Sequence, residues 1–475
     1  MLRGEALSFA ILTVAFAFFA WRSWRTWPDI LVDFGHELYI PWRLSEGEVL
    51  YKDILFTMGP LSQYANAFLF RLFGTSLMTL IGANLTILAV IVGLLFWLFR
   101  RCGALCSATF VNLFFLAVFA FAQVTLIGNY NYVCPYRHEI THGLALGLGE
   151  LACLLRFAET NRTRWLIATG FCLGLVALTK VEMLLPAGVA AVVALPMMIR
   201  NGFGDRRLAD SASSADDRSA RGWIHDLVAA AIRFVAAAAV PIILAALALA
   251  VPLGWSGAID GLSINGRLAV DPALTTNSGF YRTLAGWSAP GYGIERMVRG
   301  LAALLIVMTF GCLGDWFLSR FSRGRLLPAV VGLIAALAGL VTIRFPDLWS
   351  FVSAPLPVVL AAVLAPIAVR SLRGRLRSSA EMALGLMALY SLCLLPKILL
   401  AVGWGHYGFI LAMPGTLVLI HVAVHSIPAW LRSRYGTGDY FRALTVGLVT
   451  ACAIVQSFYW DRRCQAKTLA VGEGG

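Results

Sequence analysis

Two acidic side chains near the start of the chain have the spacing of a catalytic pair. Asp33 and Glu37 stand four residues apart, so on a helix they project from the same face. Two neighbouring carboxylates can divide the roles of general base and orienting group, or bind a metal ion together. The alternative is that both are solvated charges on a surface helix. Their position directly after the first apolar segment favours a functional role.

Two of the four lysines occur where apolar segments meet. Lys180 and Glu182 lie between two such segments with almost no loop, and Lys397 ends another segment, ahead of His406 and Tyr407. Ionisable groups at this depth are costly and usually face a cavity or a partner. Together the lysines predict a cationic pocket for a phosphate group. The alternative is that each lysine extends its amine to the membrane interface.

Residues 138–142, His-Glu-Ile-Thr-His, match the H-E-x-x-H pattern. In that pattern two histidines one helical turn apart bind zinc, and the glutamate activates a water molecule. A zinc peptidase also needs a third protein ligand, and the sequence has no recognisable distal acidic motif. One interpretation is therefore an intramembrane zinc peptidase that uses His138, Glu139 and His142. The favoured interpretation is a structural or substrate-contacting cluster.

The composition requires membrane-spanning helices to position these residues. Of the 475 residues, 59% are hydrophobic and only 13% are charged. A helix needs about 20 apolar residues to cross a bilayer. Soluble α/β enzymes, disulfide-stapled secreted domains and disordered chains are excluded, because none could keep so much apolar surface from water. The prediction is an all-α polytopic membrane protein with about thirteen transmembrane helices. The spans are expected near 5–21, 76–99, 104–123, 140–158, 165–179, 182–199, 227–251, 299–318, 326–343, 349–369, 380–400, 407–427 and 443–460.

The distribution of basic residues predicts the orientation. The net charge is +13, and most arginines fall in alternate connections between the spans. This alternation is typical of cytoplasmic loops, which also meet anionic lipid. The N-terminus is therefore expected in the cytoplasm and the C-terminus in the periplasm. The charge needs no nucleic-acid partner, and membrane lipids are the expected surroundings. The nine cysteines lie mostly in apolar runs and predict no disulfide framework.

The whole chain, 1–475, is expected to form a single membrane-embedded domain with three long connections. Residues 25–75 should form a first periplasmic loop, whose mixed charged and aromatic residues predict interfacial helices around the active site. Gly47 and Gly59-Pro60 should break it into two pieces, with 61–73 as the second. Residues 200–226 predict a flexible cytoplasmic loop. Residues 252–298 predict a long periplasmic loop, expected to act as a mobile cover.

Several segments resemble GT-C glycosyltransferases, a superfamily of membrane enzymes. Residues 33–39 (DFGHELY), 47–53 (GEVLYKD), 59–61 (GPL) and 73–74 (FG) resemble the first outer loop of these enzymes. The resemblance is narrower with bacterial relatives of protein mannosyltransferases and aminoarabinose transferases, whose membrane modules have thirteen helices. Residues 135–138, 178–182 and 406–414 also resemble segments of such proteins.

The resemblance implies an inverting transfer of a sugar from a polyprenyl-phosphate donor. The acceptor would be a glycan, a lipid or a protein, at the periplasmic face of a bacterial inner membrane. Asp33 would act as the base, and Glu37 would orient the acceptor or Asp33. The implied phosphate and donor contacts are Lys180, Lys397, His406 and Arg137, and the implied acceptor or supporting residues are Tyr39, Tyr136, His138, Glu182 and Tyr407. No cofactor is required, and a divalent metal is compatible with the family.

One departure from the family bears on the acceptor. Protein mannosyltransferases carry an adjacent aspartate and glutamate at this site, whereas Phe34, Gly35 and His36 separate Asp33 from Glu37 here. The sequence therefore does not predict the chemical identity of the acceptor. A further alternative is a lipid or solute transporter, which would need charged residues reachable from both faces and inverted repeats. The sequence shows neither pattern.

Overall fold

The computed structural model describes residues 2–28, 33–123, 130–200, 220–275, 278–321, 324, 326–344, 349, 351–376 and 378–467. Within these ranges the chain is built from helices, and an isolated bridge between Leu50 and Ile54 is the one extended pairing. Ten helices of the described residues are long and apolar enough to cross a membrane. They contain α1 (Leu2–Arg22), α4 (Leu77–Cys102), α6 (His138–Thr160), α8 (Val181–Arg200), α9 (Ala220–Val270), α12 (Pro290–Phe321), α13 (Leu326–Leu340), α15 (Leu356–Leu372), α20 (Asp439–Gln465), and a run of α17 (Gly408–Leu411), α18 (Met413–His421), η7 (Val422–Ser426) and α19 (Ile427–Tyr435).

Three shorter apolar helices complete the set. They are α5 (Leu105–Phe115, continued by the π-helical turn η2, Leu116–Ala120), α7 (Thr163–Ala177) and α16 (Ser379–Leu394). Each predicted span coincides with one of these thirteen helical segments, so the all-α polytopic architecture is confirmed. Whether each of the three shorter helices crosses the membrane stays a prediction. The division of 165–199 into two helices is also confirmed, because α7 ends at Ala177 and α8 begins at Val181.

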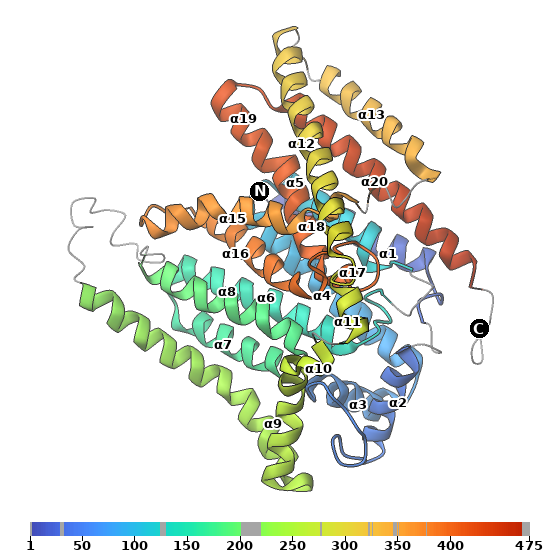
Figure 1. Ribbon diagram of the computed structural model, residues 1–475, viewed down its shortest axis with the longest axis vertical. Helices are drawn as coiled ribbons and strands as arrows, with labels where there is room; N and C mark the ends of the chain where they lie inside the picture. Colours follow the sequence, from blue (N-terminus) through green and yellow to red (C-terminus); the bar gives the residue numbers. More distant parts are fainter. Residues whose placement is uncertain are drawn as a thin grey trace.

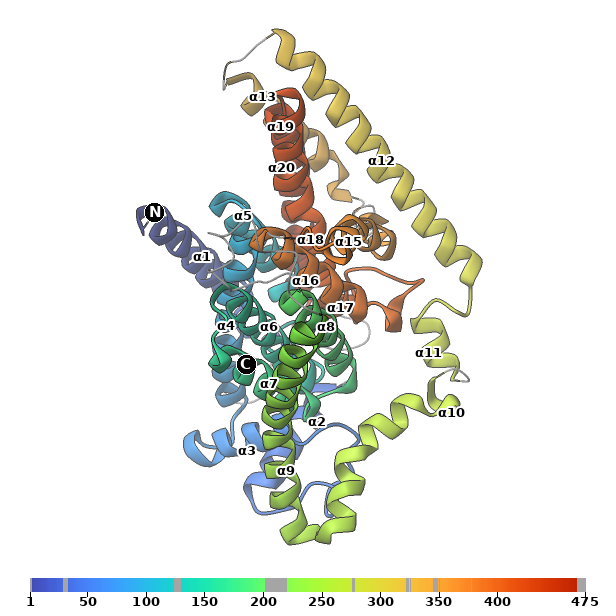
Figure 2. The same ribbon diagram turned by 90° about the vertical axis from the view of Figure 1, so that its left-hand side faces the viewer.

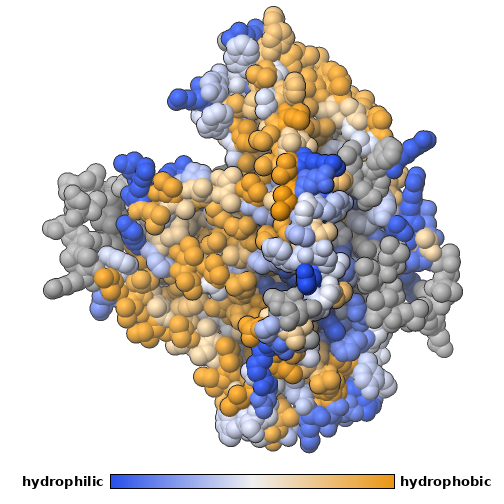
Figure 3. Space-filling view, viewed as in Figure 1, coloured by the Kyte–Doolittle hydropathy of each residue, from blue (hydrophilic) through white to orange (hydrophobic). Residues whose placement is uncertain are grey.

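The central helices pack around a continuous apolar core. The helices α4, α5, α6, α8, α16 and α18 lie at the centre, with α7 between α6 and α9, and α13 along α20 (Figure 1). Figure 2 shows α9 to α12 as an arch beside this bundle. Large apolar side chains stay exposed along α9, α12 and α13, as expected of helices that face lipid. Figure 3 shows this apolar surface, with hydrophilic residues gathered near α2 and α3.

Two helices follow the first span and carry part of the site. They are α2 (Gly35–Ser45) and α3 (Leu61–Phe73), and they stand where the sequence predicted two helical pieces. Between them Gly47 has φ +108°, a backbone conformation that glycine adopts without strain. Side chains of both helices and of the turn between them form a small separate core. The location of the two helices at a membrane surface stays a prediction.

The segment 252–298 differs from the expected loop because much of its described part is helical. The helix α9 bends at Gly254, where φ is +72°, and continues to Val270. Two short helices, α10 (Pro272–Thr275) and α11 (Gly279–Leu284), then lead to α12. Glycines and small residues that suggested a loop instead allow a bend between two helical stretches. In the predicted loop 200–226, residues 201–219 lie outside the described residues, and 220 onward belongs to α9.

Candidate active site

Glu37 of α2 lies at the centre of a buried hydrogen-bond network. Its side chain is fully buried, and its Oε1 accepts a bond from Arg137 Nη1 at 2.9 Å. Its Oε2 accepts bonds from the backbone N–H of His138 at 2.9 Å and from His138 Nδ1 at 2.7 Å. Burial raises the pKa of Glu37, but the bonds from His138 and His36 and the charge of Arg137 outweigh it, so this pKa lies well below its ordinary value. The charged carboxylate therefore anchors Arg137 and the start of α6.

Two amide side chains that the sequence analysis did not single out complete this network. Gln63 of α3 donates to Glu37 Oε2 at 3.2 Å and to Glu139 Oε1 at 2.8 Å. Asn84 of α4 lies 3.1 Å from His138 Nε2 and donates to a backbone carbonyl. Both amides are buried, Gln63 on the packed face of α3 and Asn84 on that of the apolar helix α4. A polar residue at a core position was the signal that could have identified them.

Two lysines from distant parts of the chain meet at Glu182. Lys397, in the turn η6 (Pro396–Ile398), donates to Glu182 Oε1 at 2.5 Å. Lys180 lies 3.5 Å from the same oxygen, and its Nζ donates to the Tyr136 hydroxyl at 3.4 Å. The lysine side chains are only 5% and 15% exposed. Among the described residues, Glu182 is thus the carboxylate that both ammonium groups share.

Aromatic rings surround this pair of lysines. Lys397 Nζ lies 4.4 Å from the ring centre of Tyr407 and 5.4 Å from that of Tyr281 in α11. The rings of Tyr136 and Tyr407 are 5.0 Å apart, and those of Tyr130 and Tyr136 are 5.4 Å apart. Rings placed in this way hold cations by their negative faces and offer flat surfaces to a sugar. The segment 252–298 therefore contributes at least Tyr281 to the site.

His406 occupies a strained position beside these rings. Its φ is +53°, in the left-handed region that non-glycine residues rarely adopt. Its ring centre lies 4.6 Å from that of Tyr130. Burial and the charge of Lys397 lower the pKa of His406 to about 4, so the imidazole is neutral at pH 7. Its Nδ1 is buried, and no partner for it is found among the described residues.

The charge of Asp33 acts on residues of both groups, Arg137 beside Glu37 and the tyrosines beside the lysines. It is half-buried and lies just before α2. Burial raises the pKa of Tyr130 and of Tyr407, and the charge of Asp33 raises both further. Burial lowers the pKa of Arg137, but the carboxylates of Glu37 and Asp33 help to raise it above its ordinary value. Asp33 therefore lies within electrostatic reach of both halves of the site.

Backbone contacts hold the segments of the site together. The N–H groups of Gly59 and Leu61 donate to the carbonyls of Thr179 and Leu178, at 2.7 and 3.0 Å. The Asn265 side chain of α9 accepts from the Val181 N–H at 2.7 Å and donates to the Thr57 carbonyl at 2.9 Å. A side chain on Gly59 would place its Cβ 2.2 Å from the Leu178 oxygen, so this approach requires glycine.

One candidate from the sequence lies away from these groups. The Tyr39 side chain is 51% exposed, and its ring packs against Trp42 at 6.0 Å. Tyr39 follows Glu37 by only two residues, so on the helix it points to a different face. The structure brings together the other candidates, which are Asp33, Glu37, Arg137, Tyr136, His138, Lys180, Glu182, Lys397, His406 and Tyr407.

The H-E-x-x-H segment does not fit a zinc site in this arrangement. Both ring nitrogens of His138 have partners, Glu37 and Asn84. Glu139 is buried and holds Gln63, while His142 lies one turn further into α6. In the described part of the chain, no three His, Cys, Asp or Glu residues gather as metal ligands. The cluster is therefore better explained as the structural support of Glu37, the interpretation that the sequence favoured.

Comparisons with known proteins give matches among solved structures. No family model and no curated protein matches the sequence. The oligosaccharyltransferase of Archaeoglobus fulgidus in its apo form is 15% identical, with a TM-score of 0.45 over 96% of this chain. The archaeal oligosaccharyltransferase AglB of the same organism, in complex with an inhibitory peptide and a dolichol-phosphate, is 16% identical, with a TM-score of 0.44 over 96% of the chain. The chain spans 56% of the length of each of these structures.

A third similar structure is closer to this chain in length. ArnT from Cupriavidus metallidurans is 15% identical, with a TM-score of 0.38 over 94% of this chain and 85% of its own. At TM-scores below 0.5 the likeness carries no inference about the fold or the activity of this chain. The activity is therefore inferred below from the residues of the site.

Proposed function

We propose that this protein is a GT-C glycosyltransferase that moves a sugar from a polyprenyl-phosphate donor to an acceptor at the periplasmic face of a bacterial inner membrane. One observation carries the proposal. Lys180 and Lys397 meet at Glu182, and Tyr407 packs against Lys397. The first-loop resemblance marks Asp33 as the base, and its charge acts on Tyr407. A base and a cationic group at one place are what transfer from a phosphate ester requires.

The lysine pair supplies the binding site for the donor phosphate. Lys180 and Lys397 share Glu182, so their combined charge suits an anion such as a phosphodiester. Glu182 Oε2 and His406 Nδ1 are buried polar atoms without a protein partner among the described residues. Unpaired buried polar atoms at one site indicate groups that a polar ligand completes. The surrounding tyrosines would stack against the sugar, and the isoprenoid tail would stay in the bilayer.

The reaction is a single displacement at the anomeric carbon. The acceptor oxygen forms its bond to that carbon from one side, while the bond to the phosphate oxygen breaks on the other, so the configuration inverts. Asp33 takes the acceptor proton, and the departing polyprenyl phosphate keeps the electron pair. Lys397 and Lys180 stabilise the negative charge that develops on the phosphate. Neutral His406 can accept or donate a hydrogen bond, which suits a sugar hydroxyl.

Glu37 acts as a positioning residue instead of touching the acceptor. Its two oxygens are occupied by Arg137, His138 and Gln63. It therefore holds Arg137, a positive charge on which the charge of Asp33 acts. Of the two expected roles of Glu37, orienting the acceptor or orienting Asp33, its occupied oxygens favour the second. The peptidase alternative loses support because its first histidine is committed to Glu37.

A transfer assay with two variants tests the proposal. Purified protein would be incubated with a set of synthetic polyprenyl-phosphate sugars and membrane extract, and free polyprenyl phosphate measured by mass spectrometry. We expect Asp33→Asn to lower kcat by about 10²- to 10⁴-fold, because the base is lost. Lys397→Met should lower kcat by about 10²- to 10³-fold, since it removes a charge that stabilises the leaving group.

The control for Asp33 is an acid of the same loop. Asp53 is exposed and accepts a bond from the Val49 N–H, so Asp53→Asn should retain activity. Folding of each variant would be checked by its elution from a sizing column. Full activity of Asp33→Asn would exclude it as the base. Donor transport across vesicles without any transfer would instead support the transporter alternative.

A further inference from the structure

The turn that carries Lys397 is held by the segment that joins α11 to α12. The N–H of Leu400, which follows Lys397 in this turn, donates to the carbonyl of Ala285 at 3.0 Å. Gly286 and Gly293 face the same leucine, because a Cβ added to either glycine would lie 2.7 Å from the Leu400 Cβ. On Gly293 the added Cβ would also lie 2.5 Å from the Leu400 carbonyl oxygen. We call this set of contacts the Leu400 clasp.

The Leu400 clasp depends on glycine at two positions. Gly286 has φ +82°, in the left-handed region that glycine adopts without strain. Gly293 is buried in the first turn of α12. A methyl group there would overlap backbone atoms of Leu400, which cannot turn aside as the end of a side chain can. Such a methyl group would therefore push the Lys397 turn away from α12. Gly291 of the same helical turn is exposed and has open space around it.

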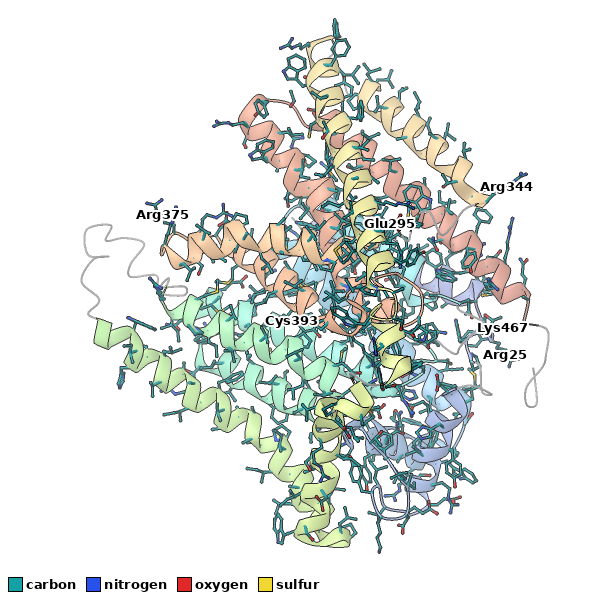
Figure 4. All side chains as sticks on the ribbon, viewed as in Figure 1. Arg25, Glu295, Arg344, Arg375, Cys393 and Lys467 are labelled. Carbon is teal, nitrogen blue, oxygen red and sulfur yellow. The ribbon has the colours of Figure 1, made fainter. Side chains whose placement is uncertain are left out.

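Two side chains of the same segment strengthen the clasp. The ring centre of Tyr281 in α11 lies 5.4 Å from Lys397 Nζ. Arg296 of α12 donates from Nη2 to the carbonyl of Val402 at 3.4 Å. Glu295, which Figure 4 labels, is the residue before Arg296 and marks this part of α12. The helices α11 and α12 therefore contact the chain on both sides of the clasp.

The position of the Lys397 backbone decides where its charge acts. The amine binds Glu182 at 2.5 Å and lies 4.4 Å from the ring centre of Tyr407, and the side chain is only 15% exposed. A lysine has a flexible stem and a point charge, so its backbone must be fixed for the charge to stay at one place. A displacement of about 1 Å in a catalytic site can cost about 10²-fold in rate. Contacts that fix the Lys397 turn therefore matter for the chemistry.

We propose that the Leu400 clasp positions Lys397 for the donor phosphate, so that Gly286, Gly293 and Tyr281 are positioning residues of the transfer site. This inference rests on the proposed function, in which Lys397 stabilises the departing phosphate. It also gives a role to the arch of α9 to α12 beside the bundle (Figure 2), because the arch contacts the bundle at the turn that carries this lysine. The two glycines act through the backbone of that turn, without touching the donor.

Acylation of the lysines of the full chain by acetic anhydride, read by mass spectrometry, tests the position of Lys397 without any transfer. We expect Gly293→Ala to raise the acylation rate of Lys397 about threefold or more, because the amine moves away from Glu182 and becomes free to react. Lys180 should keep its rate, since separate backbone contacts hold its turn. Gly291→Ala is the matched control and should change neither rate. An unchanged rate at Lys397 in Gly293→Ala, or an equal rise at Lys180, would overturn the proposal.

A double-mutant cycle tests whether the clasp acts through Lys397. With a polyprenyl-phosphate sugar as donor, Gly293→Ala should lower kcat/KM about tenfold in the wild type but less than about twofold in Lys397→Met. Tyr281→Leu should cost about two- to fivefold through the lost ring contact, whereas Tyr281→Phe keeps the ring and the activity. Equal losses from Gly293→Ala in both backgrounds would contradict the proposal. Absence of transfer in the wild type would count against the proposed function, while the acylation rates judge the clasp separately.

Discussion

Glu37→Gln removes the charge at the centre of the buried network and leaves its shape. The carboxylate is fully buried and accepts bonds from Arg137, His138 and Gln63. A glutamine amide keeps one acceptor oxygen, but its NH₂ group would face the N–H groups that now donate to Glu37. The guanidinium of Arg137 would also lose the carboxylate that pairs with it. Removing one partner of a buried ion pair costs about 3–5 kcal/mol. We expect a loss of that size in the free energy of unfolding of the variant.

The sign of the pH dependence follows from the lowered pKa of Glu37. Burial opposes the shift, but His138, His36 and Arg137 hold this pKa well below the ordinary value of 4.5. A carboxyl with a lowered pKa in the folded state stabilises the protein at neutral pH. That contribution is lost as the pH falls from about 4.5 through the folded-state pKa. The difference in stability between the wild type and Glu37→Gln should therefore shrink below pH 4.5.

Tryptophan fluorescence during denaturant titration of the detergent-solubilised protein would measure these differences. Glu46→Gln provides the control, because Glu46 is 48% exposed and pairs with Arg43 on the surface of α2. Exposed ion pairs contribute little, so no measurable loss is expected there. Equal unfolding curves for the two variants at pH 7 would refute the view that Glu37 is a charged anchor. A difference in unfolding free energy between the wild type and Glu37→Gln that stays constant as the pH falls below 4.5 would refute it as well.

Two further predictions concern the contacts around the site. Gly59→Ala should lower transfer at least tenfold, as its Cβ would lie 2.2 Å from the Leu178 oxygen, while Gly82→Ala, with open space around it, should be neutral in the same assay. His406→Gln should make the protein less sensitive to acid. Burial and Lys397 lower the pKa of His406 from 6.5 to about 4, so the wild type loses stability as pH falls through that range. Acid unfolding curves that coincide would contradict this.

The helical framework could be predicted from the sequence because its cause is local. Runs of about 20 apolar residues have few stable arrangements besides membrane-spanning helices. The separation of α7 from α8 was predictable for the same reason, since Lys180 and Glu182 interrupt the apolar run. The helical structure of residues 252–270 was not predicted, because the glycines in this segment indicate a loop when the sequence is read alone.

The candidate site could be predicted only in part. Asp33, Lys180 and Lys397 were identified because charged residues are rare beside apolar spans. Gln63 and Asn84 were missed, because an amide in a helix gives no sign of the distant partner that it binds. Glu37 was a predicted site residue, but its burial and its bonds depend on contacts between α2, α3 and α6. The contacts between these helices arise from tertiary packing, which the local sequence pattern does not predict.

The Asn265 amide joins three segments through groups that every residue possesses. It binds the backbone N–H of Val181 and the backbone carbonyl of Thr57, so neither side chain is part of these bonds. The residues at positions 57 and 181 can therefore be substituted during evolution without loss of these two hydrogen bonds. Asn265 has no such freedom, because few other side chains donate and accept over that span. In a set of homologues we expect an asparagine held constant there between two variable neighbours.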